Sequence, residues 1–299
     1  GAAAAEVSFS GAASAEYNPV GGFNTDADLD AKMSAELDNG YSVSTTLSFD
    51  TENYGGNAIA SGSLTLSSDT VSLTFGDDIT SASFSAVGDT IGFGDGKDGI
   101  QGAIGSVTMG AATLFVSTRV AAAATTVQSS DLEFGVTAAD GDMTVGFGVA
   151  DTNFVGKASG TAAGLSYTVA AGSVDDATRW DLAVSYPAGP VTVGFTVDDS
   201  EAWEASAAYA ADGLSAEVTY ASASETFDVE GSYDMGNGVV MNAGYLGETE
   251  EMYIGGSYAL GGGASAYASY VNSDSTDAGD GIGAQDYAPG TTVGLSFAF

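Results

Sequence analysis

Residues Thr25–Gly40 read TDADLDAKMSAELDNG, and this stretch shows the pattern that decides the fold. Its polar side chains stand at the even positions Asp26, Asp28, Asp30, Lys32, Ser34, Glu36 and Asp38. The odd positions from Ala27 to Leu37 carry alanine, leucine or methionine. Because successive side chains of a strand point to opposite faces, the stretch predicts a β-strand with one charged face and one apolar face.

The chain as a whole is strongly acidic. Its 299 residues include 40 Asp and Glu but 5 Lys and Arg, which gives a formal net charge of −35 at pH 7. A protein that binds the phosphate backbone of a nucleic acid needs many cationic side chains. The composition therefore excludes nucleic acid as a partner.

Cysteine and histidine are both absent from the chain. Their absence excludes disulfides, Cys/His zinc sites and nucleophiles that a histidine activates. Enzymes that cleave glycosides use a pair of carboxylates at a defined separation. No spacing in this sequence singles out such a pair of acids. The sequence therefore predicts a protein that is not an enzyme.

The alternation of Thr25–Gly40 recurs along nearly the whole chain, and no stretch predicts a helix. No apolar run approaches the ~18–20 residues of a membrane helix. In the second half the pattern repeats, because the tyrosine before each turn stands at Tyr186, Tyr209, Tyr233 and Tyr258, spaced 23, 24 and 25 residues apart. We interpret each repeat as one hairpin of two strands and a tight turn.

An all-β architecture follows from this pattern, and two forms of it remain open. In an antiparallel transmembrane β-barrel, alternating side chains face lipid outside and water inside. The hairpins predict 16–20 strands, an even number, in a single domain that spans residues 1–299. The alternative is a non-transporting surface or adhesin-like β-sheet protein. Its core would have to pack alanines and glycines beside isolated tyrosine rings, which fills space poorly, so the barrel is favoured.

One long stretch in the first half lacks the alternation, namely GDDITSASFSAVGDTIGFGDGKDG at Gly76–Gly99. Such a long connection among short turns is usually functional or disordered. Inside a barrel it would form a constriction loop, and the alternative is an external cap or a solvated flap. Its candidate constriction residues are Asp77, Asp78, Asp89, Asp95, Lys97 and Asp98. Asp95 and Asp98 also form a candidate calcium site, because Ca²⁺ takes carboxylate and carbonyl oxygens. No other cofactor is expected.

The alternation also places the charged side chains of the strands inside the barrel. The expected lumen-wall residues are Asp28, Asp30, Lys32, Glu36, Arg119 and Arg179. A Lys or Arg on the lipid face at mid-depth costs about 2–4 kcal/mol, which explains the segregation of charge. Asp28 and Asp30 lie about 7 Å apart and repel by roughly 0.6 kcal/mol in water. Accumulated cations relieve this repulsion, so the sequence predicts a cation-preferring pore.

Four stretches carry a resemblance to a known family. EVSFSG (Glu6–Gly11) is similar to the first strand, and GGSYALGGGASAYASY (Gly255–Tyr270) to the penultimate hairpin, of general porins of the alphaproteobacterial type, like those of purple photosynthetic bacteria. VGLSFAF (Val293–Phe299) resembles their terminal strand. LTFGDDITSASFSAVGD (Leu73–Asp89) resembles the end of a strand and the start of the loop that folds into their pore.

The resemblance implies a homotrimer in the bacterial outer membrane, in contact with lipid and lipopolysaccharide. It implies passive diffusion of small hydrophilic solutes and ions, through an eyelet where loop acids face arginines on the barrel wall. Thr25–Gly40 stands where the family carries part of that basic wall. Here the same positions hold Asp28 and Asp30, with Lys32 as the single base. The arrangement of charge across the pore is therefore expected to differ from that of the family.

Overall fold

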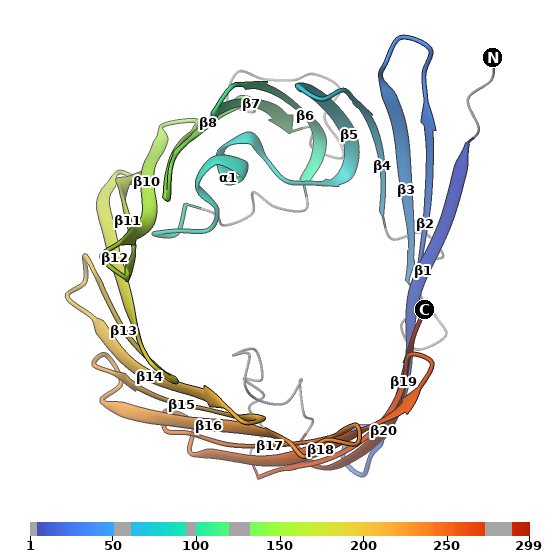
Figure 1. Cartoon of the computed structure of the whole chain (residues 1–299), viewed down its shortest axis with the longest axis vertical. Helices are drawn as coiled ribbons and strands as arrows, with labels where there is room; N and C mark the ends of the chain where they lie inside the picture. Colours follow the sequence, from blue (N-terminus) through green and yellow to red (C-terminus); the bar gives the residue numbers. More distant parts are fainter. Residues whose placement is uncertain (1–4, 51–60, 94–99, 120–131, 273–288) are drawn as a thin grey trace.

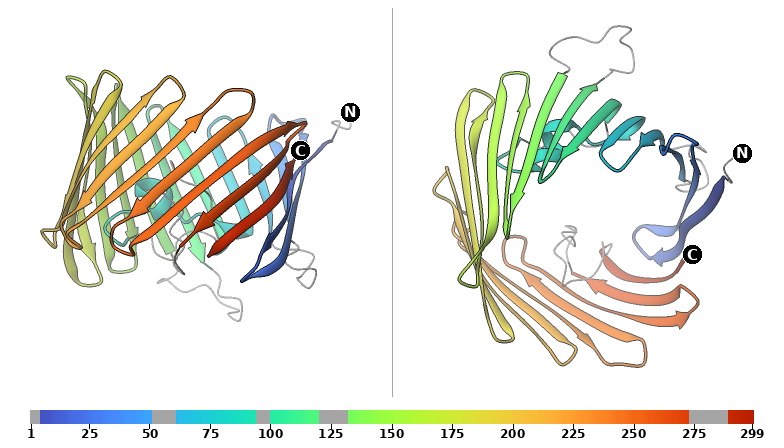
Figure 2. Two further views of the ribbon diagram at one scale, coloured as in Figure 1. Left: turned by 90° about the horizontal axis from the view of Figure 1, so that it is seen from below. Right: turned by 45° about the horizontal axis from the view of Figure 1, so that its top comes forward.

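Twenty antiparallel strands form one sheet within residues 5–50, 61–93, 100–119, 132–272 and 289–299, the parts of the chain that this computed structural model describes. Seen end-on, the strands form a ring (Figure 1). Seen from the side, the strands are tilted relative to the axis of the barrel (Figure 2). The expectation of an even number between 16 and 20 is confirmed. The strands are β1 (Glu6–Asn18), β2 (Gly22–Glu36), β3 (Ser42–Asp50), β4 (Ser61–Ser67), β5 (Val71–Ile79), β6 (Ile100–Met109), β7 (Ala112–Arg119), β8 (Leu132–Asp140), β9 (Met143–Ala150), β10 (Asn153–Ala162), β11 (Leu165–Val174), β12 (Ala177–Ala188), β13 (Val191–Asp198), β14 (Trp203–Ala211), β15 (Leu214–Ala221), β16 (Thr226–Asp234), β17 (Val239–Leu246), β18 (Glu251–Gly261), β19 (Ala264–Val271) and β20 (Gly290–Ala298).

The ring closes between its first and last strands. Each strand pairs with its neighbours in sequence, and β20 also pairs with β1, where Val293–Ala298 lies opposite Ala12–Tyr17. Beyond this ladder the backbone N–H of Gly11 donates to the carbonyl of Phe299 at 3.1 Å, and that of Phe299 donates to Gly11 at 3.0 Å. The sheet therefore has no open edge along this seam.

Tight turns join many neighbouring strands. Between β14 and β15, Asp212 and Gly213 have φ values of 53° and 81°. Positive φ at both central residues defines the type I′ turn, whose twist matches that of the strands it connects. Aspartate and glycine adopt this conformation readily, and a β-branched residue does not. The Asp-Gly pair therefore fixes the register of this hairpin.

The two faces of the sheet differ as the alternation predicts. Large apolar side chains such as Phe75, Val145 and Val218 are exposed on the outer face. Directly opposed residues of paired strands lie on the same face of the sheet. Across β2 to β5 such a row of opposed residues consists of Glu36, Ser42, Ser67 and Ser72. These residues belong to the polar inner face.

A short helix, α1 (Ala82–Val87), follows β5, and the prediction that the chain has no helix is wrong at this point. Six residues are fewer than two helical turns, too few to show a period of 3.6. The Ser81 side chain caps the helix by accepting a hydrogen bond from the N–H of Phe84 at 3.3 Å. In the described chain, no helix has the length and apolar character needed to cross a bilayer.

The long connection after β5 begins later than the sequence predicts. The strand continues to Ile79, with a register shift against β6 between Gly76 and Ile79. Asp77 and Asp78 therefore belong to β5 rather than to the loop that was expected from Gly76. An irregular pairing of this kind leaves no clean alternation, which is why the sequence did not reveal the strand end.

The outer face provides a test of the fold. Val218 lies near the middle of β15 and is 42% exposed, whereas its neighbour Thr219 faces inward opposite Asp228. We expect Val218→Lys to lower the free energy of unfolding by about 2–4 kcal/mol, because lipid cannot solvate the ammonium group. Urea unfolding in phospholipid vesicles measures this loss.

The matched control for this test is Thr219→Lys, which places the same charge in the lumen beside an acid. We expect it to change the unfolding free energy far less. Equal losses in the two variants would contradict the assignment of the two faces.

Candidate pore lumen

The segment after β5 folds into the ring of strands. Figure 1 shows α1 inside the ring, and α1 contacts β7, β8, β9 and β10. Its residues Ala82, Ser83, Ala86 and Val87 are buried against this wall. The described part of the inward segment, residues 80–93, therefore occupies one side of the lumen.

Polar contacts attach the start of this segment to the wall. The N–H of Ala82 donates to the Ser117 hydroxyl on β7 at 2.8 Å. The Ser83 hydroxyl donates to the Glu133 carboxylate on β8, where Glu133 is 6% exposed. Hydrogen bonds that involve a charged group are the stronger ones in proteins, so these contacts resist displacement of the helix start.

Two further contacts attach the end of the segment. Lys157 Nζ on β10 donates to the Val87 carbonyl oxygen at 2.9 Å. The Thr90 hydroxyl donates to the Asp181 carboxylate on β12 at 3.0 Å. Asp181 also accepts from the N–H of Ala170 at 3.0 Å. These hydrogen bonds join the segment to four strands of the wall, β7, β8, β10 and β12.

An apolar cluster fills the space between the inward segment and the wall. Its buried members are Ala86, Val87, Phe93, Ala150, Val155, Ala170 and Val174, with Ile91 and Phe115 packed against them. Phe93 is 1% exposed. The wall residues among them point into the barrel, where the alternation predicted polar side chains. The inward segment covers them, so they lie in a small protein core rather than in water.

The predicted constriction residues are spread over several environments. The Asp77 carboxylate accepts a hydrogen bond from the N–H of Gly62 on β4 at 2.5 Å, so it lies against the barrel wall. Asp78 lies on β5. Asp89 is exposed in the inward segment. Asp95, Lys97 and Asp98, with the candidate calcium site, lie outside the described residues.

The predicted lumen-wall residues fall into two groups across the ring. Asp28, Asp30, Lys32 and Glu36 are all exposed along β2, and Asp30 accepts a hydrogen bond from Ser48 at 2.6 Å. Arg119 on β7 and Arg179 on β12 are exposed on the side that holds α1. Arg119 lies opposite Gly102, which in turn lies opposite the inward-facing Gly76, so Arg119 also faces inward. Arg179 faces inward as well, because it lies opposite the inward-facing Gly172. The structure therefore lines up the four residues along the inner face of β2 and keeps them apart from the two arginines.

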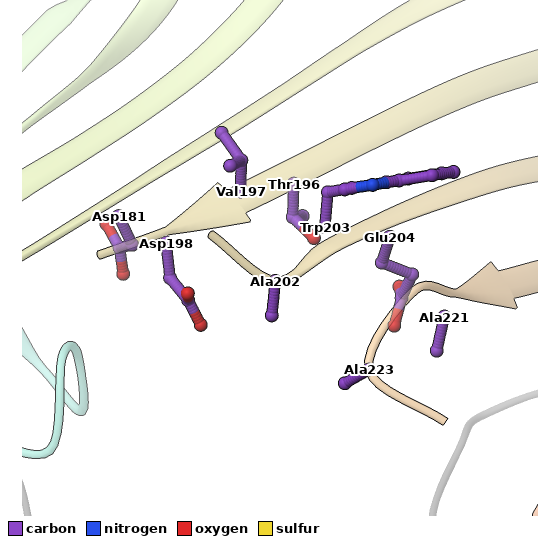
Figure 3. Close-up of a pocket in the computed structure, with 9 residues that line it drawn as sticks. All are labelled: Asp181, Thr196, Val197, Asp198, Ala202, Trp203, Glu204, Ala221 and Ala223. Carbon is purple, nitrogen blue, oxygen red and sulfur yellow. The ribbon is translucent and has the colours of Figure 1, made fainter. Parts of the chain in front are cut away.

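A recess in the inner wall holds further acids. It has a volume of about 310 Å³ and lies over β12 to β15. Figure 3 shows the carboxylates of Asp181, Asp198 and Glu204 on one side of the wall, with Trp203 turned the other way. Asp181 lies directly opposite Asp198 in the strand register. Asp198 follows Thr192, Gly194 and Thr196 on the polar face of β13, so the alternation of this strand was a signal that could have identified it.

A second group of inward acids lies on β15 and β16. Glu217 is directly opposite Glu230, and Thr219 is directly opposite Asp228. Glu230 is 9% exposed and accepts a hydrogen bond from the Tyr253 hydroxyl, while Asp228 accepts one from the N–H of Gly247 at 2.7 Å. Among the described residues, no three acids converge in an arrangement that could hold a metal ion.

A closed barrel with an apolar outer face and a polar, charged lining defines a transmembrane β-barrel channel. A family model for Gram-negative porins matches residues 1–278. The chain belongs to the Gram-negative porin family. It is therefore an outer-membrane channel protein without enzymatic activity, as the sequence predicted.

Solved structures similar to this chain include porins from Rhodopseudomonas blastica. A multiple mutant of that porin has 15% sequence identity over 98% of this chain and 100% of its own, with a TM-score of 0.47. A triple mutant has 15% identity over the same shares of the two chains, with a TM-score of 0.45. The search of curated proteins found no match.

Proposed function

We propose that the chain forms one barrel domain over residues 1–299 whose water-filled pore prefers cations. The observation that supports this most is the excess of acids on the inner wall. The described strands carry four inward bases, Lys32, Arg119, Lys157 and Arg179, one of which is bonded to the inward segment. The inward acids on the described strands include Glu16, Asp28, Asp30, Glu36, Glu133, Asp181, Asp198, Glu204, Glu217, Asp228 and Glu230.

The charge imbalance acts on mobile ions through the field in the lumen. Walls of low dielectric constant focus the field of like charges and raise the local concentration of counter-ions. Directly opposed carboxylates such as Glu217 and Glu230 repel each other, and a passing cation lowers that repulsion. The proposed preference therefore follows from the sum of the acids rather than from any one of them.

The inward segment, residues 80–93, is the proposed constriction. Its attachment to the inner wall supports this role, because a segment packed on one side of a ring reduces the open cross-section at its level. Asp89 is exposed on it and adds another negative charge at that level. Small hydrophilic solutes and ions are the proposed cargo.

The inward aromatic residues favour a general pore over a sugar-specific one. Tyr253 donates to Glu230, Tyr267 donates to Glu16 at 3.0 Å, and Phe115 packs against the apolar cluster under the inward segment. Each ring thus has a partner in the protein, and Phe115 on β7 is on a different part of the barrel from Tyr253 on β18 and Tyr267 on β19. A sugar path needs rings aligned along the pore for stacking.

Ion selectivity provides the test of the main proposal. In a planar bilayer with a tenfold KCl gradient, we expect the reversal potential of the wild-type channel to have the sign of cation preference. The double variant Asp28→Asn with Asp30→Asn is expected to shift it toward zero, because it removes two lumen charges and keeps the side-chain shapes. Asp198→Asn with Glu204→Gln tests the acidic recess in the same way.

The matched control is Asp140→Asn with Asp142→Asn, which removes two exposed acids at the turn between β8 and β9. It changes the net charge equally and leaves the lumen unchanged, so we expect the wild-type reversal potential. Anion preference of the wild type would refute the proposal. An unchanged potential in both lumen variants would place the selectivity elsewhere in the pore.

The oligomeric state is a further part of the proposal. A homotrimer in contact with outer-membrane lipid and lipopolysaccharide is supported by the family to which the chain belongs. Sedimentation of the detergent-solubilised protein is expected to give three times the mass of 29.5 kDa for the chain, after correction for bound detergent. A single-chain mass would contradict it.

Transport is proposed to need no cofactor, since diffusion through a water-filled pore involves no chemical step. We expect EDTA on both sides of the bilayer to leave the single-channel conductance in KCl unchanged. A fall in conductance that Ca²⁺ restores would instead support calcium at Asp95 and Asp98.

A further inference from the structure

Three glycines of the inner wall lie directly under α1. They are Gly135 on β8 and Gly146 and Gly148 on β9, here called the glycine patch. Gly135 is directly opposite Gly148, and Gly146 is directly opposite Lys157, whose side chain reaches the inward segment. All three therefore share the inner face.

The patch has no room for a side chain. A Cβ atom added at Gly135 would overlap the carbonyl oxygen of Ala82, and one added at Gly146 would overlap that of Ala86. At Gly148 it would lie 3.0 Å from the carbonyl oxygen of Ser83 and 3.1 Å from Cε1 of Phe93. The backbone of α1 thus rests on the backbone of the wall.

The surrounding contacts limit how α1 can respond to an added methyl group. At its start Ala82 is bonded to Ser117, and at its end Val87 is bonded to Lys157. Ala86, Val87 and Phe93 are held in the apolar cluster. Sideways movement would break these contacts without relieving the overlap, whereas a small shift away from the wall, into the lumen, relieves it directly.

We propose that the glycine patch determines the size limit of the pore by setting how far α1 projects into the lumen. With glycine at all three positions, α1 lies as close to the wall as backbone contact allows. A methyl group at Gly135 or Gly146 moves α1 inward by roughly 1–1.5 Å, because non-bonded heavy atoms settle about 3.5 Å apart. The inference rests on the proposed role of residues 80–93 as the constriction.

The test compares Gly135→Ala and Gly146→Ala with the wild type in two measurements. Single-channel conductance in a planar bilayer is a property of each open channel and does not depend on how much protein folds. Swelling of proteoliposomes in sugars of increasing size gives the dependence of flux on solute size. We expect a lower conductance per channel and a loss of flux that is greater for the larger sugars.

Gly194→Ala is the matched control. Gly194 also faces the lumen, but on β13 away from α1, and an added Cβ there would meet the Ser206 hydroxyl at 2.6 Å, a group that can rotate aside. We expect wild-type conductance and size dependence for this variant. If Gly135→Ala or Gly146→Ala fails to fold, Gly148→Ala provides a milder overlap with the same expected direction.

Two outcomes would overturn the inference. Wild-type conductance and size dependence in the patch variants would show that α1 does not respond to its contact with the wall. A higher conductance would show that α1 leaves the wall instead of moving into the lumen. The reversal potential separates this inference from the proposed cation preference, since anion preference of the wild type would refute that preference and leave the size comparison intact.

Discussion

The hydrogen bonds between β1 and β20 are the interaction on which the rest of the structure depends. A bilayer offers no water to satisfy exposed backbone N–H and carbonyl groups, so a sheet that spans it cannot keep a free edge. Here Ala12–Tyr17 pairs with Val293–Ala298, and Gly11 and Phe299 exchange two more hydrogen bonds. Closure joins the two ends of the chain, and every strand between them is then held by a partner on each side.

Closure also decides where charge can lie. Once the sheet is a ring, each strand has one face toward lipid and one toward the lumen, and the period of two assigns every residue to one of them. Val218 and Thr219 are neighbours in sequence and lie on opposite sides of the wall. The penalty for charge in lipid is enough to bring acids and bases into the lumen. It does not explain why the acids outnumber the bases, and this imbalance is what carries the argument for cation preference.

The period of two is local, so the barrel and its two faces could be predicted from the sequence. The attachment of the inward segment could not, because it depends on pairs far apart in the chain, such as Thr90 with Asp181. A signal was nevertheless present. Val155 and Ala170 are apolar at inward positions, and Gly135, Gly146 and Gly148 lack side chains on the same part of the wall. Apolar and glycine residues at inward positions indicate a packing surface only once the strand register shows that they lie side by side.

The same attachment makes the lumen electrically uneven. Packing a segment against a wall requires small and apolar residues there, because a buried carboxylate must be hydrogen-bonded, as Glu133 is to Ser83. The wall under α1 therefore has little room for acids, and they are left for the rest of the ring. β15 to β18 lie across the ring from α1 (Figure 1), and they carry Glu217, Asp228 and Glu230. An ion that passes the inward segment thus has this acidic wall on its other side. The proposed constriction and the proposed ion preference are for this reason linked through one packing arrangement.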